Sequence, residues 1–270
     1  MDDQRQDQLA NAISAAIDAG RAIMEVYEGT IEVENKADGS PLTEADLRSH
    51  RIICDALDKG SDYPVLSEES KGVAYADRKD WPLFWLVDPL DGTKEFIKRN
   101  GEFTVNIALI EGHRPVMGVV YAPVLDILYA GLVDQGAWYL NDASKAGENI
   151  SAKMQAVPPA KAPAKELIRV VASRSHMNDD TREFISGLES RHDRVELVSK
   201  GSSLKICMLA MDEADIYPRV APTMEWDTAA AHGFLLASGG QIYQFGSDEA
   251  LVYNKADLLN PFFVGLQKRP

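Results

Sequence analysis

Apolar residues recur every three or four positions in two early stretches of the chain. Between residues about 6 and 28 they include Leu9, Ile13 and Ile17, the spacing of one buried helix face. The same periodicity returns between residues 43 and 60, where a final glycine is a typical helix stop. The pattern therefore predicts two amphipathic helices at the start of the chain.

Short apolar runs separated by turn residues then replace the helical period. The runs cover residues 83–87, 103–110, 116–121, 127–132 and 137–140. Runs of this length, bounded by Gly, Pro and Asp, are typical of strands. Their close succession predicts a largely antiparallel sheet.

Beyond residue 166, strand-like and helix-like segments alternate, which predicts a smaller α/β lobe. Residues 151–166 are rich in Ala, Pro and Lys and lack periodicity, so they form either a linker between two lobes or a long surface loop. We expect an α/β protein with an N-terminal α+β lobe, residues 1–160, and a C-terminal α/β lobe, residues 161–270. In that second lobe strands are expected at 170–172, 194–198, 216–217 and 241–245, and helices at 179–189, 202–212 and 227–238.

The formal net charge of −14 argues against a nucleic-acid surface, because phosphate backbones are held by clustered Lys and Arg. An anionic substrate remains compatible with this charge if divalent cations stand between carboxylates and phosphate. Two cysteines, Cys54 and Cys207, in apolar contexts predict reduced thiols. The acidic, polar first residues and the absence of a long apolar run predict a cytoplasmic protein; peripheral association with the inner membrane stays open.

An acidic motif that begins at Asp88 follows the first expected strand directly. Asp88, Asp91 and the Leu90 carbonyl would lie around one point, and hard divalent cations bind several such oxygens. Gly92 permits close approach of the backbone, and Thr93 offers a hydroxyl and an N–H group to a bound phosphate. Asp-Pro and Asp-Gly are also common turn formers, so the motif alone is equally consistent with an acidic turn.

Three other acidic positions have both a structural and a chemical interpretation. Glu68 and Glu69 follow a short apolar run, and are either an exposed acidic pair or a further carboxylate near the same point. Asp227 opens an Ala-rich helix, where an N-cap is the ordinary role of aspartate. Thr43 and Asp46 match a helix capping box.

Four segments in this order carry a specific resemblance: residues 38–46, 67–69, 88–93 and 226–230. Together they resemble the inositol-monophosphatase superfamily of lithium-sensitive, Mg²⁺-dependent phosphatases, which are fructose-1,6-bisphosphatase-like in fold. The resemblance implies a layered α-β-α-β-α sandwich, with two or three Mg²⁺ ions held between the lobes.

The resemblance also implies roles for individual residues. Asp46 would act at a weaker third metal site or through water, and Thr93, hydrogen-bonded to Asp46, would orient and activate the nucleophilic water. Glu68 would serve both as a metal ligand and in catalysis. The metal-activated water would then attack phosphorus directly. The implied ligands are Glu68, Asp88 and the Leu90 carbonyl for the first ion, and Asp88, Asp91 and Asp227 for the second.

Within the superfamily, the segments 40–43, 171–176, 201–205 and 217–219 resemble those of the 3′(2′),5′-bisphosphate nucleotidases. These phosphoric monoester hydrolases remove the 3′-phosphate from 3′-phosphoadenosine 5′-phosphate, a by-product of sulfate activation. A bisphosphate requires a second anion site, which hydroxyls, helix-start amides and an Arg fork can form. The expected substrate-binding residues are Gly92, Thr93, Ser173, Arg174, His176, Gly201, Ser202, Lys205 and Arg219.

Each substrate residue also has a plainer interpretation. The sequence Gly-Ser-Ser before an apolar helix is an ordinary cap, Lys205 is compatible with a solvated charge, and His176 with a surface imidazole. Two rival functions remain at this point: an inositol or sugar monophosphate phosphatase on the same cage, and a non-catalytic regulatory binding protein. The sequence leaves the oligomeric state open.

Overall fold

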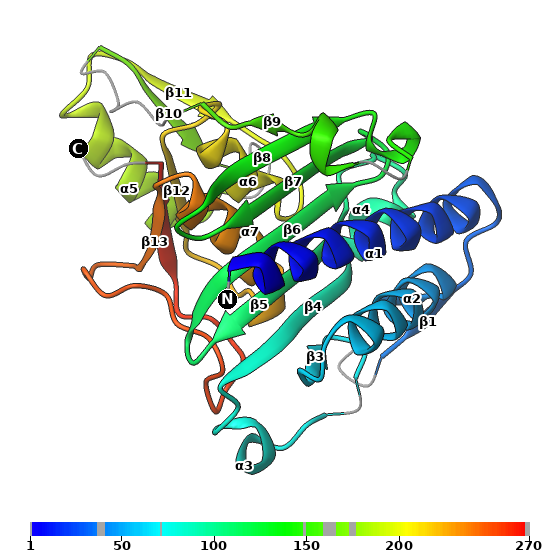
Figure 1. Ribbon diagram of the computed structural model, residues 1–270. Coiled ribbons are helices and arrows are strands. Elements are labelled where there is room, and N and C mark those ends of the chain that lie inside the picture. Colours follow the sequence, from blue (N-terminus) through cyan, green and yellow to red (C-terminus); the bar gives the residue numbers. More distant parts are fainter. Residues whose placement is uncertain are drawn as a thin grey trace.

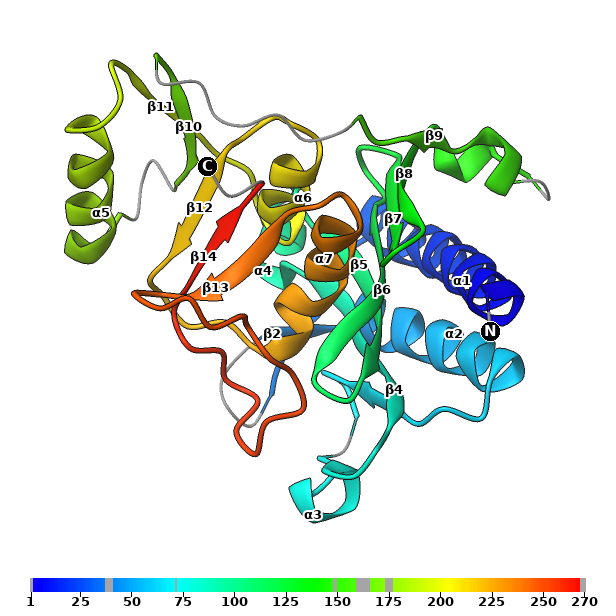
Figure 2. The same ribbon diagram turned by 60° about the vertical axis from the view of Figure 1, so that its left-hand side comes forward.

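The protein is built from five layers of alternating helix and sheet. The computed structural model describes residues 2–36, 41–70, 72–147, 150–158, 166–172 and 177–267. From right to left, Figure 2 shows a helical pair, a seven-stranded sheet, a second helical layer, a five-stranded sheet and an outer helix. The expected α-β-α-β-α sandwich is therefore confirmed.

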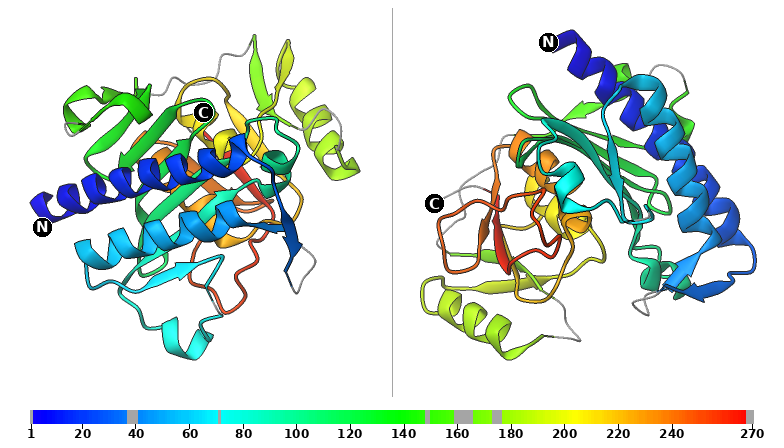
Figure 3. Two further views of the ribbon diagram at one scale, coloured as in Figure 1. Left: turned by 90° about the vertical axis from the view of Figure 1, so that its right-hand side faces the viewer. Right: turned by 90° about the horizontal axis from the view of Figure 1, so that it is seen from below.

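The first layer consists of α1 (Asp2–Glu28) and α2 (Glu44–Gly60), which lie side by side over one face of the large sheet (Figure 3). Both expected helices are confirmed, and α1 begins before its expected start. Thr43 is the N-cap of α2 in the predicted capping box. A short hairpin of β1 (Val33–Asn35) and β2 (Pro41–Thr43), not expected from the sequence, precedes α2.

The large sheet has the strand order β3-β4-β5-β6-β7-β8-β9 (Figure 1). Its strands pair antiparallel from β4 onward, as expected, and only β3 is parallel to its neighbour β4. The bounds are β3 Val65–Ser67, β4 Leu83–Asp91, β5 Thr104–Glu111, β6 Arg114–Ala122, β7 Ile127–Leu132, β8 Gly136–Asn141 and β9 Gln155–Ala156.

β4 does not stop at Asp88, as the sequence suggested, but continues to Asp91 with an irregularity in between. Asp88 lies opposite Asn106 and Asp91 lies opposite Thr104, so the register shifts between the two aspartates. Pro89 has no N–H for the ladder, and a bulge of this kind accommodates it while turning side chains toward a new direction.

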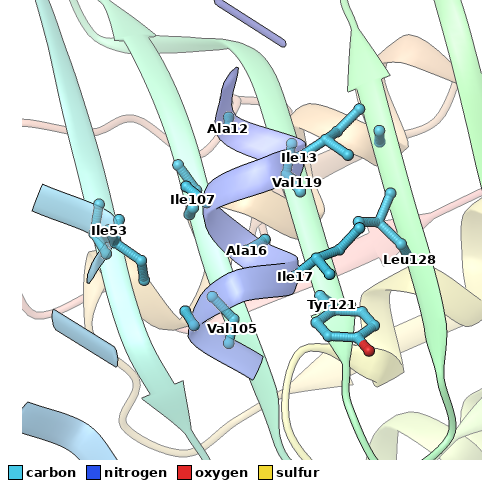
Figure 4. Close-up of a cluster of buried hydrophobic side chains, with 14 of the residues drawn as sticks. Ala12, Ile13, Ala16, Ile17, Ile53, Val105, Ile107, Val119, Tyr121 and Leu128 are labelled. Carbon is cyan, nitrogen blue, oxygen red and sulfur yellow. The ribbon is translucent and has the colours of Figure 1, made fainter. Parts of the chain in front are cut away.

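The helical pair covers the sheet with a dense apolar core (Figure 4). Ile13 and Ile17 of α1 pack in the same cluster as Val105, Ile107 and Val119 of the sheet, and all five are at most 2% exposed. Burying side chains of this size stabilises the fold by about 1.5–3 kcal/mol each. This core holds α2 against β4, and both elements carry candidate site residues.

The opposite face of the large sheet packs against α6 (Leu204–Ala210) and α7 (Glu225–Ala237). The α7 backbone lies almost directly on the sheet, because a Cβ at Gly118 would stand 1.9 Å from the Ala230 carbonyl oxygen. A side chain at Gly131 would likewise meet the backbone of Phe234. Small residues therefore set the depth of α7 and, with it, the place of its first turn.

The second sheet has the order β11-β10-β12-β14-β13, with α5 (Asp179–Glu189) outside it. α6 is shorter than expected at both ends, where Ser202 and Asp212 adopt left-handed φ values of 53° and 58°. α7 begins two residues earlier than expected. β14 was not foreseen. The bounds are β10 Ile168–Val171, β11 Val195–Val198, β12 Ile216–Arg219, β13 Gln241–Gln244 and β14 Phe263–Leu266; short helices are α3 Tyr75–Arg78, α4 Thr93–Ile97, η1 Ala143–Lys145 and η2 Ser151–Lys153.

The segment interpreted as a linker or surface loop is partly structured. Residues 151–156 contain η2 and β9, and β9 pairs with β8 of the large sheet. Residues 159–165 lie outside the described part of the chain. Within the described part, none of the helices has the length and apolar character needed to cross a membrane.

Candidate metal and phosphate site

Three aspartates converge where the end of β4 meets the first turn of α7. Carboxylate oxygens of Asp88, Asp91 and Asp227 all lie within 4.8 Å of one another. Asp88 and Asp91 stand on either side of the bulge in β4, and α7 brings Asp227 from a distant part of the sequence. Three convergent carboxylates form an oxygen donor set of the kind that hard divalent cations bind.

The electrostatics of this cluster favour a cation. Burial, followed by the charges of Glu68, Asp91 and Asp227, raises the pKa of Asp88 well above its usual value. Burial and then the charge of Asp91 raise the pKa of Asp227 to about 7. Like charges held together out of water are costly, and a divalent ion removes that cost. The donor set therefore fits a divalent metal.

Hydrogen bonds from β5 and from the segment between β11 and α6 orient the Asp91 carboxylate. Its Oδ2 accepts from the Ser203 N–H at 2.7 Å, from the Ser202 hydroxyl, and at 3.4 Å from Asn106 Nδ2. Within the described residues Oδ1 accepts no such bond, so it is available to a cation. Ser202 was expected to contact substrate; its hydroxyl donates to the candidate metal ligand Asp91, and the residue also lines the cavity beside the cluster.

Two buried polar residues of β5 connect Asp91 with Asp227. Thr104 donates to Asn106 Oδ1 at 2.9 Å, and Asn106 Nδ2 donates to the Ser203 hydroxyl at 2.9 Å. Ser203 in turn donates to the backbone carbonyl of Asp227 at 2.6 Å. Thr104 and Asn106 were not predicted from the sequence, although their alternation on one face of an apolar strand was a signal that could have found them. Ser203 lies in the predicted anion-binding segment 201–205, and here it bonds Asp91 and the Asp227 backbone.

Glu68 lies at the end of β3 beside Asp88. Its Oε1 accepts from Lys36 Nζ at 2.7 Å, and the same ammonium also contacts Glu69 at 2.5 Å. Burial raises the pKa of Glu68, while the Lys36 charge opposes the rise. The expected carboxylate is thus present next to the cluster. Lys36 stands in a polar segment without a recognisable pattern, so the sequence gives no sign of its contacts.

Asp46 combines its two expected contacts. Oδ2 accepts from the Thr43 N–H at 2.7 Å, as a capping box requires, and also from the Thr43 hydroxyl at 2.6 Å. Oδ1 accepts from the Thr93 hydroxyl at 3.4 Å. One turn later, Ser49 donates to the Pro89 carbonyl at 2.6 Å, so α2 holds the loop of β4 at two points.

The Leu90 peptide lies in the irregular part of β4 between Asp88 and Asp91. Its N–H donates to Asp88 Oδ1 at 3.0 Å, and its carbonyl lies 3.4 Å from the Thr93 hydroxyl. Gly92 adopts a φ of 92°, and a Cβ there would approach the Glu102 carbonyl oxygen to 3.4 Å. Glycine therefore suits both the left-handed backbone and the limited space.

Asp227 is not an N-cap, contrary to the sequence-based interpretation. The N-cap of α7 is Met224, and Asp227 is the third residue of the helix, where its Oδ2 accepts from the Met224 N–H at 2.8 Å. The cause is the earlier start of α7. The carboxylate still caps the helix with one oxygen, from inside the first turn.

Two adjoining cavities open beside the cluster. One of about 240 Å³ is lined by Asp91, Gly92, Ser202 and Asp227, and a second of about 520 Å³ extends outward past Gly201. Their shared wall contains Glu95, Lys205, Tyr217 and Arg219.

The two cations of that wall have few partners. Lys205 Nζ contacts the Lys200 carbonyl at 3.4 Å, and burial lowers the pKa of the ammonium. Arg219 donates to the Pro222 carbonyl at 3.1 Å, while its buried Nε lacks a partner among the described residues. Lys205 and Arg219 are therefore suited to bind an anionic group that occupies the cavities. The predicted residues Ser173, Arg174 and His176 lie outside the described part of the chain.

The site and the layered fold define the class of protein: the chain belongs to the inositol monophosphatase family, whose model matches residues 5–261. It is 43% identical over 258 residues to the 3′(2′),5′-bisphosphate nucleotidase CysQ of Shigella flexneri, covering 94% of this chain and 98% of that protein. The CysQ of Escherichia coli K12 shows the same identity and coverage.

Solved structures agree with this assignment. The crystal structure of CysQ from Bacteroides thetaiotaomicron superposes with a TM-score of 0.86 at 47% identity, covering 97% of each chain. Inositol monophosphatase II of Staphylococcus aureus has a TM-score of 0.72 at 22% identity, covering 95% of this chain and 87% of its own. The second match demonstrates a common fold only.

Metal-dependent stabilisation should increase with pH because the cluster holds protons that a cation must displace. The Asp227 pKa of about 7 exceeds its usual value of 3.8, so above about pH 4 the folded metal-free state binds more protons than the unfolded chain. This term makes the metal-free protein less stable as pH rises toward 7. We expect Mg²⁺ to raise the melting temperature more at about pH 8 than at about pH 6. Thermal denaturation with and without Mg²⁺ at both pH values checks this, and equal increments would contradict it.

Proposed function

We propose that the protein hydrolyses the 3′-phosphate of 3′-phosphoadenosine 5′-phosphate, giving AMP and phosphate, as a Mg²⁺-dependent bisphosphate nucleotidase. The observation that carries the proposal is the aspartate cluster opening into cavities whose shared wall bears Lys205 and Arg219. The aspartate end of the cavities suits metal ions and the phosphate that is to be hydrolysed. The wall that bears Lys205 and Arg219 suits a second anion. The name of the relatives at 43% identity, 3′(2′),5′-bisphosphate nucleotidase, supports a nucleoside bisphosphate as substrate. We propose a cytoplasmic role in nucleotide recycling during sulfur assimilation.

We propose that two or three Mg²⁺ ions lie between two lobes, residues 1–160 and 161–270. When bound, such ions neutralise phosphoryl oxygens, acidify water and stabilise the leaving alkoxide. Their ligands would be Glu68, Asp88 and the Leu90 carbonyl for the first ion, and Asp88, Asp91 and Asp227 for the second.

The remaining chemistry belongs to Asp46 and Thr93. The Thr93 hydroxyl would accept a hydrogen bond from the attacking water while it donates its own proton toward Asp46. This arrangement aims a water lone pair at phosphorus and provides a path for the released proton. Glu68 would help to hold the same water. The backbone amides of Gly92 and Thr93 would bind the phosphoryl oxygens.

Recognition of the second phosphate would fall to Lys205 and Arg219, with Gly201 and Ser202 at the entrance between the cavities. Ser173, Arg174 and His176 are proposed to complete this subsite. A planar guanidinium and a half-buried ammonium provide directional, charge-assisted hydrogen bonds to an anion. An inositol or sugar monophosphate lacks that second anion.

A substrate panel tests the proposal. Purified protein in Mg²⁺ should hydrolyse 3′-phosphoadenosine 5′-phosphate far more efficiently than inositol 1-phosphate, measured as kcat/KM from phosphate release. Added Li⁺ should inhibit the reaction. Preferential turnover of inositol 1-phosphate would overturn the nucleotidase assignment while leaving the metal site intact, and no turnover of either compound would favour a binding protein.

Lys205→Met and Arg219→Ala should reduce turnover of the bisphosphate selectively. Each substitution removes a charge-assisted hydrogen bond to the distal phosphate, worth about 1.5–3 kcal/mol, or roughly 10- to 150-fold in kcat/KM. Hydrolysis of 3′-AMP, which lacks the 5′-phosphate, should change little. Arg194→Ala is the control, since Arg194 is an exposed residue ion-paired with Glu196. Equal losses on both substrates would point to general damage.

A further inference from the structure

The loop of residues 251–260, between β13 and β14, holds the first turn of α7 through a series of hydrogen bonds. The Glu225 N–H donates to the Leu258 carbonyl at 2.9 Å, and the Asn260 N–H donates to the Thr223 carbonyl at 2.8 Å. Asn260 Nδ2 also donates to the Met224 carbonyl at 2.8 Å. The loop thus fixes the point at which α7 begins, two residues before the candidate ligand Asp227.

Glu225, the first residue of α7, has a completely buried carboxylate that contacts this loop. Its Oε2 accepts from the Asn254 N–H at 2.6 Å, and its Oε1 accepts from the Lys255 N–H at 3.0 Å and from Lys255 Nζ at 2.5 Å. The carboxylate therefore joins the backbone of the loop to the first residue of the helix. A buried charge is tolerated only with such complete pairing.

Asn254 extends the network from the loop to α3. Its Oδ1 accepts from Arg78 Nη1 at 2.7 Å, and its Nδ2 donates to the Arg78 carbonyl at 2.9 Å. Arg78 is 2% exposed, and its Nη2 reaches the Ala256 carbonyl at 3.3 Å. Asn254 adopts a left-handed φ of 60°, a conformation that asparagine tolerates better than most residues.

The position of α3 in the chain connects this network with the strands that carry candidate ligands. α3 lies in the connection between β3, whose end precedes Glu68, and β4, which carries Asp88 and Asp91. In Figure 1, this connection lies below the large sheet, with α3 at its lowest point. Arg78 therefore ties the segment that follows Glu68 to the loop that fixes Asp227.

We propose that Arg78, Asn254 and Glu225 are positioning residues that set the distance between Glu68 and Asp227, and so the affinity of the cage for divalent cations. The inference rests on the metal cage of the proposed function, but not on its substrate. Asn254 joins Arg78 through its side chain and Glu225 through its backbone N–H. The effect of this connection is to fix geometry, as supporting residues do around other metal sites.

Asn254→Gly and Arg78→Met test the network without touching a ligand. Glycine fits the left-handed backbone at 254 and removes both side-chain bonds to Arg78, whereas Met keeps much of the volume of Arg78 without its charge. We expect both variants to need roughly tenfold more Mg²⁺ than the wild type for the same rise in melting temperature above their own metal-free values. The Mg²⁺ concentration for half-maximal activity should rise in parallel, with kcat at saturating Mg²⁺ retained.

Matched controls separate positioning from general stability. Asp134→Gly changes an exposed turn residue with a φ of 70°, and Arg169→Met removes an arginine paired with Asp212 and Asp215 inside the second lobe. Both should leave the Mg²⁺ dependence as in the wild type. If Arg78→Met does not fold, Asn254→Gly decides alone.

The possible failures are distinguishable. A wild-type protein whose melting temperature ignores Mg²⁺ would overturn the metal cage itself. A wild-type protein that responds, with variants that melt earlier but keep its Mg²⁺ dependence, would show that the network is merely structural.

Discussion

Asp91→Asn should abolish Mg²⁺-dependent hydrolysis while the protein stays folded, with kcat/KM reduced by about 10³-fold or more. An amide oxygen at this position can still accept from the Ser203 N–H, as Oδ2 does now. The amide nitrogen must then take the place of Oδ1, where it repels a cation instead of binding it. One substitution thereby removes a ligand and a negative charge.

The same substitution should not destabilise the metal-free protein. The charge of Asp91 raises the pKa of both Asp88 and Asp227, so its removal relieves repulsion in the cluster. We expect an unchanged or higher melting temperature without Mg²⁺, and little further rise when Mg²⁺ is added. Asp134→Asn, at an exposed turn, is the control, and wild-type turnover by Asp91→Asn would exclude the proposed cage.

Thr93→Val should reduce kcat by about 10²- to 10⁴-fold, the usual contribution of an oriented proton acceptor. Valine matches threonine in shape but cannot bridge a water to Asp46, whose Oδ1 lies 3.4 Å from the Thr93 hydroxyl. Because Thr93 is not among the proposed ligands, Mg²⁺ should still raise the melting temperature of this variant. Thr93→Ser, which keeps the hydroxyl, should recover most of the activity.

Together the two variants separate metal binding from water activation. Asp91→Asn loses the thermal response to Mg²⁺ and the activity, whereas Thr93→Val loses the activity alone. A Thr93→Val protein that no longer responds to Mg²⁺ would assign the Thr93 hydroxyl to the cage itself. One with wild-type kcat would remove Thr93 from the mechanism.

Local patterns were sufficient for most of the fold. The two first helices, the antiparallel meander and the alternating second lobe all follow from the apolar period, because burial of one face acts on each element separately. The predicted ends of the helices and strands were less accurate. β4 continues past Asp88 and α7 starts at Glu225, since a bulge and a capping loop, both set by tertiary neighbours, displace the ends.

Some residues of the candidate site could likewise be predicted from local sequence, and others could not. The motif at Asp88, the capping box at Asp46 and the acidic residue at the end of β3 could be recognised from the sequence, because each is a short local arrangement. Asn106 could have been noticed as a polar residue on an apolar strand, but its partner Ser203 could not have been named from the sequence. Lys36 could not be assigned, since its partner Glu68 comes from another segment of the chain.

The sequence by itself determined most of the helices and strands, the family they resemble and the chemical type of each candidate ligand. Only the tertiary structure decided that Asp88, Asp91 and Asp227 meet within 4.8 Å, that Ser202 turns toward Asp91, and that Arg78 reaches Asn254. The physical reason is that side-chain type and periodicity act over a few residues, whereas the convergence of carboxylates depends on how closely α7 packs against the large sheet. That packing is set by contacts between residues far apart in the chain.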